Sequence, residues 1–213
     1  MKIKDIMTWN VVTVSSDTPI MEARKIMETH KIQRLPVVDR GKLVGIVTRD
    51  RIASAGPSPI STLSVWEMNY LLSKLKVKEI MQKDVVTIEP EASVEHALVH
   101  AQKYGVGIMP VLEKDKVVGV VTTTDFALKV LNPIMGIGKP GTRLNISNCN
   151  QAKPIKEVMD IVTKLGLKIV TAHTLPPEEE TVSGFTLHVD TEDAKQLIKE
   201  IEAKGMRVSI VER

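Results

Sequence analysis

The sequence is poor in several features that would point to particular classes of protein. It has a single cysteine, Cys149, among 213 residues, which excludes an intrachain disulfide and a zinc site built from clustered cysteines. Its apolar stretches are strand-sized and interrupted by charge, whereas a membrane-spanning helix needs about 20 apolar residues. The 29 basic residues are nearly balanced by 26 acidic ones, so the net charge of +3 gives no electrostatic reason to expect nucleic acid or anionic membranes as partners.

The first residues, MKIKDIMTWNVV, also lack the uninterrupted apolar segment and the small-residue cleavage site of a secretory signal. We therefore expect a cytoplasmic protein. The composition, with 43% hydrophobic and 26% charged residues, is ordinary for a soluble protein. The length allows one large domain or two modest domains, each with a core of its own.

The most informative feature of the sequence is an internal repeat. The segment KIKDIMTWNVVTV, which starts at Lys2, recurs as KVKEIMQKDVVTI from Lys76, at an offset of 74 residues. The offset continues without a gap, so GIVT at 45–48 matches GVVT at 119–122, and Arg51 matches Asp125. A gapless repeat of this length indicates two copies of one structural unit.

Apolar periodicity predicts that each copy is a small α+β unit of β-α-β-β-α order, with a tight turn between its second and third strands. The elements expected in the first copy are 11–14, 19–29, 35–38, 43–48 and a helix from about residue 50. Those expected in the second copy are 85–88, 93–104, 108–112, 117–122 and 125–131. A helix is expected between the copies, at 63–75. Because such a unit cannot cover its own sheet, we expect the copies to pack as a pseudo-symmetric pair.

The residues that carry the repeat resemble those of a tandem pair of CBS domains. The markers are DIMT and EIMQ before the first strands, LPVVD and MPVLE in the middle, and GIVT and GVVT before the last helices. The resemblance runs almost continuously from Lys2 to about Leu131. It places the first CBS repeat at 1–55, a linker and helix at 56–75, and the second repeat at 76–132.

In this family the acid at the start of the last helix binds a ribose, and the resemblance implies that role for Asp125. A carboxylate offers acceptor oxygens that match the hydroxyl donors of a ribose diol, and Thr122 adds a hydroxyl for ribose or phosphate. The N–H groups at a helix start also favour anions. The alternative is that Asp125 only caps the helix. By resemblance, the adenine would lie between two segments, Val85, Val86, Thr87 and Gly107, Ile108, Met109, Pro110.

The first copy departs from the family pattern, because Arg51 stands where the second copy has Asp125. A guanidinium group only donates hydrogen bonds, so it cannot accept one from a diol. Asp50 is one residue too early, which turns a side chain by about 100° at a helix start. We expect this site to be weak or empty for adenosine. Arg51 is then either a solvated surface cation or, with Arg34, a contact for the phosphates of a ligand held by Asp125.

The segment GIGKPG at 136–141 has the spelling of a dinucleotide-binding motif, but its context is wrong. It follows a helix rather than a strand, and Pro140 would interrupt the helix that should come next. We interpret 133–141 as a linker. From residue 142 the pattern predicts a ferredoxin-like β-α-β-β-α-β domain, an antiparallel sheet with both helices on one face. The expected elements are 142–147, 154–164, 168–174, 185–190, 192–203 and 207–211, with an acidic turn at 176–183.

The order of elements in 142–213 resembles an ACT domain, a small regulatory fold that commonly pairs and can bind amino acids. Residues 148–152 depart from that family's acidic residue and Pro-Gly pair before the first helix. We therefore expect pairing of sheet edges between subunits and leave amino-acid binding open. A CBS pair followed by an ACT-like domain is also the layout of the acetoin-utilisation protein B family, which the whole chain resembles.

The sequence contains no recognisable catalytic or metal-binding constellation. His96 and His100 lie four apart on one predicted helix but lack a third ligand. No GxSxG segment presents a nucleophile, and nothing next to Cys149 would lower its pKa. We expect no catalytic residues, no metal site and no cofactor.

The resulting hypothesis is a non-enzymatic regulatory protein. It binds an adenine nucleotide or adenosyl ligand (AMP, ADP, ATP or S-adenosylmethionine) in the CBS pair, with a role for magnesium left open, and signals by domain rearrangement. The expected partners are a second copy in a homodimer and a protein target that the sequence does not identify. The alternative is a structural homodimerisation scaffold with a vestigial ligand site.

Overall fold

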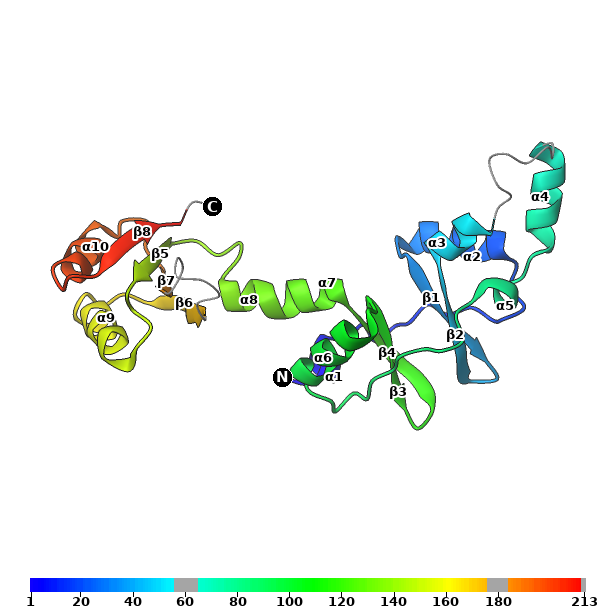
Figure 1. Ribbon diagram of the computed structural model, residues 1–213, viewed down its shortest axis with the longest axis horizontal. Coiled ribbons are helices and arrows are strands. Elements are labelled where there is room, and N and C mark those ends of the chain that lie inside the picture. The colour runs from blue at the N-terminus through cyan, green and yellow to red at the C-terminus, as the bar shows by residue number, and fades with distance from the viewer. Residues whose placement is uncertain (56–64, 176–183, 212–213) are drawn as a thin grey trace. The chain divides into compact units, whose positions relative to one another are not determined.

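The structure is a computed structural model that describes residues 1–55, 65–175 and 184–211 (Figure 1). The chain divides into two units, Met1–Ala127 and Leu128–Arg213.

The first unit contains the two copies of the repeat, and each copy is a hairpin flanked by helices (Figure 1). The first copy and the segment before it comprise α1 (Ile3–Ile6), α2 (Ile20–His30), β1 (Arg34–Asp39), β2 (Lys42–Thr48) and α3 (Arg49–Ser54). The helices between the copies are α4 (Val65–Lys74) and α5 (Val77–Ile80). The second copy comprises α6 (Val94–Tyr104), β3 (Ile108–Glu113), β4 (Lys116–Thr122) and α7 (Thr123–Phe126). Each element of the second set begins 74 residues after its counterpart, which confirms the repeat as a structural one.

The hairpins β1–β2 and β3–β4 were predicted from the sequence and are confirmed, down to their turns. Arg40 and Gly41 in one turn, and Lys114 and Asp115 in the other, have positive φ angles of 51°, 79°, 49° and 64°. Two consecutive residues in this conformation form the turn that matches the twist of a two-residue hairpin. Both ladders also shift register at the same repeat position, after Val37 and after its counterpart.

The short strands expected at 11–14 and 85–88 are wrong. In their place are single parallel bridges, from Val14 to Val37 and, in the second copy, between the equivalent residues. Pairing stops in the first copy because the next available N–H, that of Ser16, is bound by the Asp39 carboxylate at 3.0 Å. The sequence also did not predict α1 and α5, which end at the second residue of DIMT and of EIMQ.

The last helix of the second copy differs from the expected 125–131. It starts earlier as α7, continues as a π-helical turn at Ala127–Leu131, and ends in α8 (Asn132–Met135). The first residues of the predicted linker 133–141 are therefore helical. Pro133, which has no N–H to donate, follows directly after the π-helical turn.

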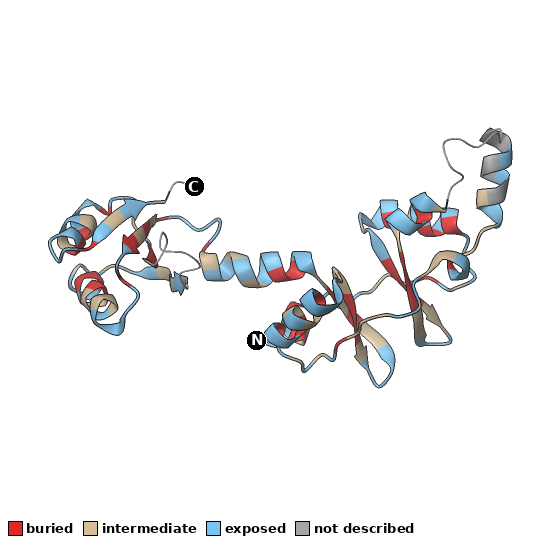
Figure 2. Cartoon of the chain, in the orientation of Figure 1, coloured by how far each residue is buried: buried red, intermediate tan, exposed pale blue. Residues whose placement is uncertain are grey.

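The opening segments of the two copies are exchanged, in that the segment preceding each copy packs on the other copy. Residues 2–8 pack on the second copy, where the Ile3 N–H donates to Ala92 O at 2.9 Å and Thr8 pairs with Val120. The segment 76–82 packs on the first copy in the equivalent way, and its fully buried Val77 joins the core of that copy. The core of each copy is therefore completed by a segment that precedes the other copy. The buried residues of both copies lie where strands face helices (Figure 2).

The second unit has the β-α-β-β-α-β order predicted for it. Its elements after α8 are β5 (Thr142–Ser147), α9 (Ala152–Lys164), β6 (Ile169–Leu175), β7 (Gly184–Val189), α10 (Lys195–Glu202) and β8 (Arg207–Ile210). The sheet order is β6-β7-β5-β8, with every neighbouring pair antiparallel. Alternate residues of β5 and β7, such as Leu144 and Leu187, form a core with α9 and α10 on one face. The acidic turn expected at 176–183 lies outside the described residues.

Candidate functional site

The start of α7 is fixed by a reciprocal set of hydrogen bonds between Thr122 and Asp125. The Asp125 carboxylate accepts from the backbone N–H of Thr122 at 2.9 Å and from its hydroxyl at 2.7 Å. The Asp125 N–H donates in return to Thr122 Oγ1 at 3.3 Å. This arrangement is a capping box, so Asp125 stabilises the helix start whatever else it binds.

A cavity of about 380 Å³ lies beside this helix start, and both copies of the repeat form its walls. The first copy and its opening segment contribute Thr8, Asn10, Val11, Val12, Lys31, Ile32, Gln33, Arg34 and Pro36. The second copy contributes Gly107, Ile108, Val120, Thr122, Thr123, Thr124 and Asp125. The volume is typical of sites for small molecules, and the walls combine apolar side chains with a few polar ones, as such sites do.

The structure brings five of the residues singled out from the sequence to this cavity: Thr122, Asp125, Gly107, Ile108 and Arg34. Met109 and Pro110 follow in β3, but both are buried and neither lines the cavity.

Val85, Val86 and Thr87 do not line the cavity beside Asp125, and Val11 and Val12 take the place expected for them. The cause is the exchange of opening segments. Because Thr8 pairs with the second copy and Val14 with the first, the residues between them cross from one copy to the other along the cavity. The offset of 74 residues could have suggested Val11 and Val12, their repeat equivalents, but not which copy each segment packs on.

Arg51 also lies away from this cavity. Its N–H donates to Thr48 Oγ1 at 3.2 Å, as Asp125 does to Thr122. Its guanidinium Nη1 donates to the carbonyl oxygen of Ile80 at 3.2 Å, at the end of α5, where a cation is favourable. Arg51 is therefore an exposed cation that contacts the exchanged segment, and it does not line this cavity together with Arg34.

Two cations and one carboxylate set the electrostatics of the cavity. Arg34 and Lys31 both line it, and within the described part of the chain neither forms an ion pair. Arg34 lies close to Gly107, where a Cβ atom would come within 3.2 Å of its guanidinium. With Asp125 also lining it, the cavity combines a carboxylate acceptor with cationic donors.

Groups that could bind a metal ion are not assembled in the described ranges. No cluster of three or more His, Cys, Asp or Glu side chains there is suited to a metal ion; His96 and His100 stack with ring centroids 4.5 Å apart. Burial, and then the charge of Glu157, raises the pKa of the Cys149 thiol, the opposite of what a thiolate nucleophile needs. Among the residues that the structure describes, none of the helices is both long and apolar enough to cross a membrane.

Comparison with known proteins identifies relatives of the chain. An L-aspartate semialdehyde sulfurtransferase of Methanocaldococcus jannaschii is 35% identical over 127 residues, which are 59% of this chain. The chain spans only 22% of the length of that enzyme.

Two solved structures resemble the chain. The CBS domain pair of protein MJ0100, in complex with 5′-methylthioadenosine and S-adenosyl-L-methionine, is 36% identical with a TM-score of 0.50 and covers 60% of this chain and 93% of its own. A structure described as an acetoin utilization protein (AcuB) from Vibrio cholerae is 28% identical with a TM-score of 0.52, and covers 62% and 92%. The model of the CBS domain matches residues 3–58 and 77–132, just over half of the chain and one match to each copy of the repeat. The chain belongs to the CBS-domain family and carries a tandem pair of these domains.

Proposed function

We propose that the chain is a regulatory protein that binds an adenosyl ligand in the cavity beside Asp125. The observation that carries the proposal is that Thr122 and Asp125 share one cavity with apolar and cationic residues of the other copy. The proposal is also supported by the CBS pair of protein MJ0100, which is in complex with two adenosyl compounds.

Each wall of the cavity suits one part of such a ligand. Asp125 accepts hydrogen bonds from the ribose hydroxyls, and Thr122 lies beside the same group. Val11, Val12 and Ile108 cover the adenine faces, and Gly107 permits close approach of its backbone. The phosphates of a nucleotide reach Arg34 and Lys31, whose charges favour phosphorylated ligands over neutral ones.

A ligand in this position contacts both copies of the repeat at once, and this is how binding becomes a signal. The segment 9–13 lines the cavity while it connects the two copies. A ligand that binds one arrangement of the copies more tightly than another shifts their populations by that difference in affinity. Arrangements that move 9–13 relative to α7 are the ones the ligand distinguishes.

The proposal also assigns domain boundaries and a role in dimerisation to the second unit. We assign CBS repeats to 1–55 and 76–132, with 56–75 and 133–141 as connecting segments, and an ACT-like domain to 142–213. The ACT-like assignment is supported by the order of its elements and by its sheet. The short edge strand β8 exposes Ile210, and edge pairing there would join two copies of the chain. The chain has no catalytic role of its own in this proposal.

Calorimetric titration tests the ligand site. AMP, ADP, ATP, S-adenosylmethionine and methylthioadenosine are titrated into the wild-type chain and into Asp125→Ala, with and without magnesium. The matched control is Asp50→Ala, an exposed aspartate in the equivalent helix start, which does not line the cavity. One site that is lost in Asp125→Ala and kept in Asp50→Ala supports the proposal. A chain that dimerises but gives no heat with any ligand is instead the scaffold with a vestigial site.

A further inference from the structure

The second unit has a polar sheet face opposite its helices. On β5, Arg143 and Asn145 alternate with the core residues Leu144 and Ile146, so they point to the other face. On β7 and β6 the residues in register with them are also polar. The cross-strand rows are Arg143, His188 and Thr171, and then Asn145, Thr186 and His173.

This polar face is covered rather than solvated. His188 is fully buried and Thr186 is 8% exposed. The loop 136–140 lies over the first row, where the His188 ring nitrogen Nε2 is 3.0 Å from Pro140 O. The loop can approach this closely because residue 136 is glycine, where a Cβ atom would come within 2.6 Å of His188 Nδ1.

Three side chains on this face are only partly satisfied by the rest of the protein. Arg143 donates one guanidinium bond to the carbonyl oxygen of Met135. Its Nε, the Thr171 hydroxyl and both ring nitrogens of His173 are buried without a hydrogen-bond partner among the described residues. Thr186 and Asn145 differ from these three, because the Thr186 hydroxyl donates to Asn145 Oδ1 at 2.7 Å. Buried polar groups in native proteins nearly always have partners, so orphaned ones that cluster indicate a bound polar species.

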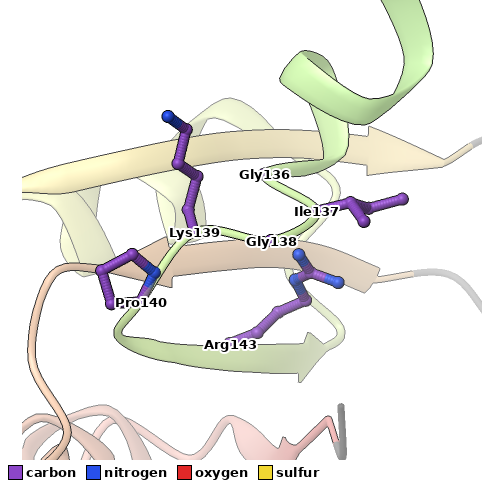
Figure 3. A pocket seen from close by; sticks show the side chains of 6 residues that line it. All are labelled: Gly136, Ile137, Gly138, Lys139, Pro140 and Arg143. Carbon is purple, nitrogen blue, oxygen red and sulfur yellow. The ribbon is translucent and has the colours of Figure 1, made fainter. Parts of the chain in front are cut away.

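A cavity of about 500 Å³ opens between the loop 136–140 and Arg143. Figure 3 shows the Arg143 side chain rising from β5 towards the loop, which also carries Lys139. Within the described ranges no carboxylate forms an ion pair with either cation. Burial and then the nearby Arg143 charge lower the pKa of His173, which favours its neutral ring.

We propose that this cavity is a second ligand site, one that binds a small metabolite through a carboxylate or phosphate oxyanion held by Arg143. The guanidinium presents a planar fork of donors that fits either oxyanion. Lys139 contributes charge at the mouth. The site does not depend on the adenosyl site, because all of its residues belong to the second unit. In the segment 136–141, Gly136 thus allows the close approach of the loop to His188.

The test uses the full chain and a readout local to the site. Imidazole resonances of His173 and His188 are followed by NMR during titration with sodium phosphate and, separately, sodium acetate, at constant ionic strength set with sodium chloride. The expected result is a saturable shift with at least one of the two anions. Saturation by phosphate alone, or by acetate alone, identifies the source of the oxyanion.

Variants decide whether Arg143 holds the anion. We expect Arg143→Gln to raise the dissociation constant at least tenfold, Lys139→Gln to raise it a few-fold, and the exposed control Lys204→Gln to leave it unchanged. Arg143→Lys, which keeps the charge but loses the planar fork, should weaken binding to an intermediate degree. This variant replaces Arg143→Gln in the test if Arg143→Gln does not fold. A linear, non-saturable shift with both anions, or an unchanged dissociation constant in the Arg143 variants, would overturn the proposal. Asp125→Ala should leave this titration unaltered, which separates it from the adenosyl site.

Discussion

The Thr122 hydroxyl donates a hydrogen bond of 2.7 Å to the Asp125 carboxylate, at the point where β4 gives way to α7. The equivalent threonine of the first copy has no such partner, because Arg51 replaces the acid. The alternative that Asp125 caps the helix and the proposal that it binds ribose are therefore compatible, since the same carboxylate can do both. They can be separated by measuring stability and binding in the same variants.

Removal of the Asp125 carboxylate should destabilise the ligand-free protein. Asp125→Ala deletes the acceptor for two hydrogen bonds at a helix start, and we expect a loss of about 1 kcal/mol in the free energy of unfolding. Urea denaturation without ligand measures it. Arg51→Ala, the repeat-equivalent control, removes one exposed contact and should cost less than about 0.5 kcal/mol. Equal stability of wild type and Asp125→Ala would show that the capping box contributes nothing.

Neutralising Arg34 should change ligand preference rather than stability. Arg34 lines the cavity and forms no ion pair in the described part of the chain, so its loss removes little from the fold. If it meets phosphates, Arg34→Gln weakens AMP or ATP binding about tenfold, the value of one charge-assisted contact, and leaves methylthioadenosine unchanged. Calorimetry measures both. Lys42→Gln, an exposed cation on β2, is the matched control. A parallel loss for neutral and phosphorylated ligands would contradict a phosphate role.

The ion pairs that hold the first exchanged segment should respond to pH. Hydrogen bonds from Lys2 and then Lys4 lower the pKa of Glu91 from 4.5 to about 2. A carboxyl group whose pKa is lowered by folding adds stability above the unfolded pKa and loses it as the pH falls through the folded value. The stability difference between wild type and Glu91→Gln should therefore be present at pH 7 and shrink between pH 4.5 and 2. High salt should also reduce it.

Thermal unfolding of the two proteins at several pH values checks this prediction. Glu113→Gln, a change at an exposed glutamate of β3, is the control and should not show the same trend. A wild-type advantage that stays constant from pH 7 to pH 2 would mean that Glu91 and the lysines do not interact in solution. Asp17 forms the same pairs with Lys76 and Lys78 in the other copy, at 3.0 and 2.9 Å, and Asp17→Asn should behave alike.

Two equivalent glycines should tolerate alanine differently. A Cβ atom on Gly45 would lie 2.8 Å from the backbone oxygen of Gln82, in the exchanged segment, and the backbone there would have to move. On Gly119 it would instead meet the flexible side chain of Met7, at 2.5 Å from its sulfur. We expect Gly45→Ala to cost about 1–3 kcal/mol and Gly119→Ala clearly less. Thermal melts of both variants rank them, and the reverse order would be inconsistent with this packing.

The pattern of apolar residues was enough to predict the hairpins, because strands with tight turns are determined locally. It also predicted the order of elements in the second unit, where alternation in β5 and β7 separates a core face from a polar one. It was not enough for the exchange of 2–8 and 76–82. The two segments have nearly the same residues, and only packing decides which copy each one joins. For that reason the sequence did not show that Val11 and Val12, rather than Val85 and Val86, line the cavity beside Asp125.

The covered polar face of the second unit was likewise not predictable. In the sequence, Thr186 and His188 alternate with apolar neighbours, and that pattern normally means that the polar residues face water. Only the loop 136–140, whose position depends on a glycine next to His188, shows that they are buried. From the sequence alone, this loop was interpreted as part of a linker that has the spelling of a dinucleotide-binding motif in the wrong context.

The exchange of opening segments also affects how the chain acquires its structure during synthesis. Ile3 leaves the ribosome early, but the backbone oxygen it bonds, that of Ala92, follows only after several seconds at about 5–20 residues per second. The core of the first copy likewise waits for Val77. A nascent chain from which only the first copy has emerged therefore lacks the segment 76–82, which completes the core of that copy. Its own segment 2–8 has no second copy to pack on. The pair must reach its native state as one cooperative event once both halves have emerged.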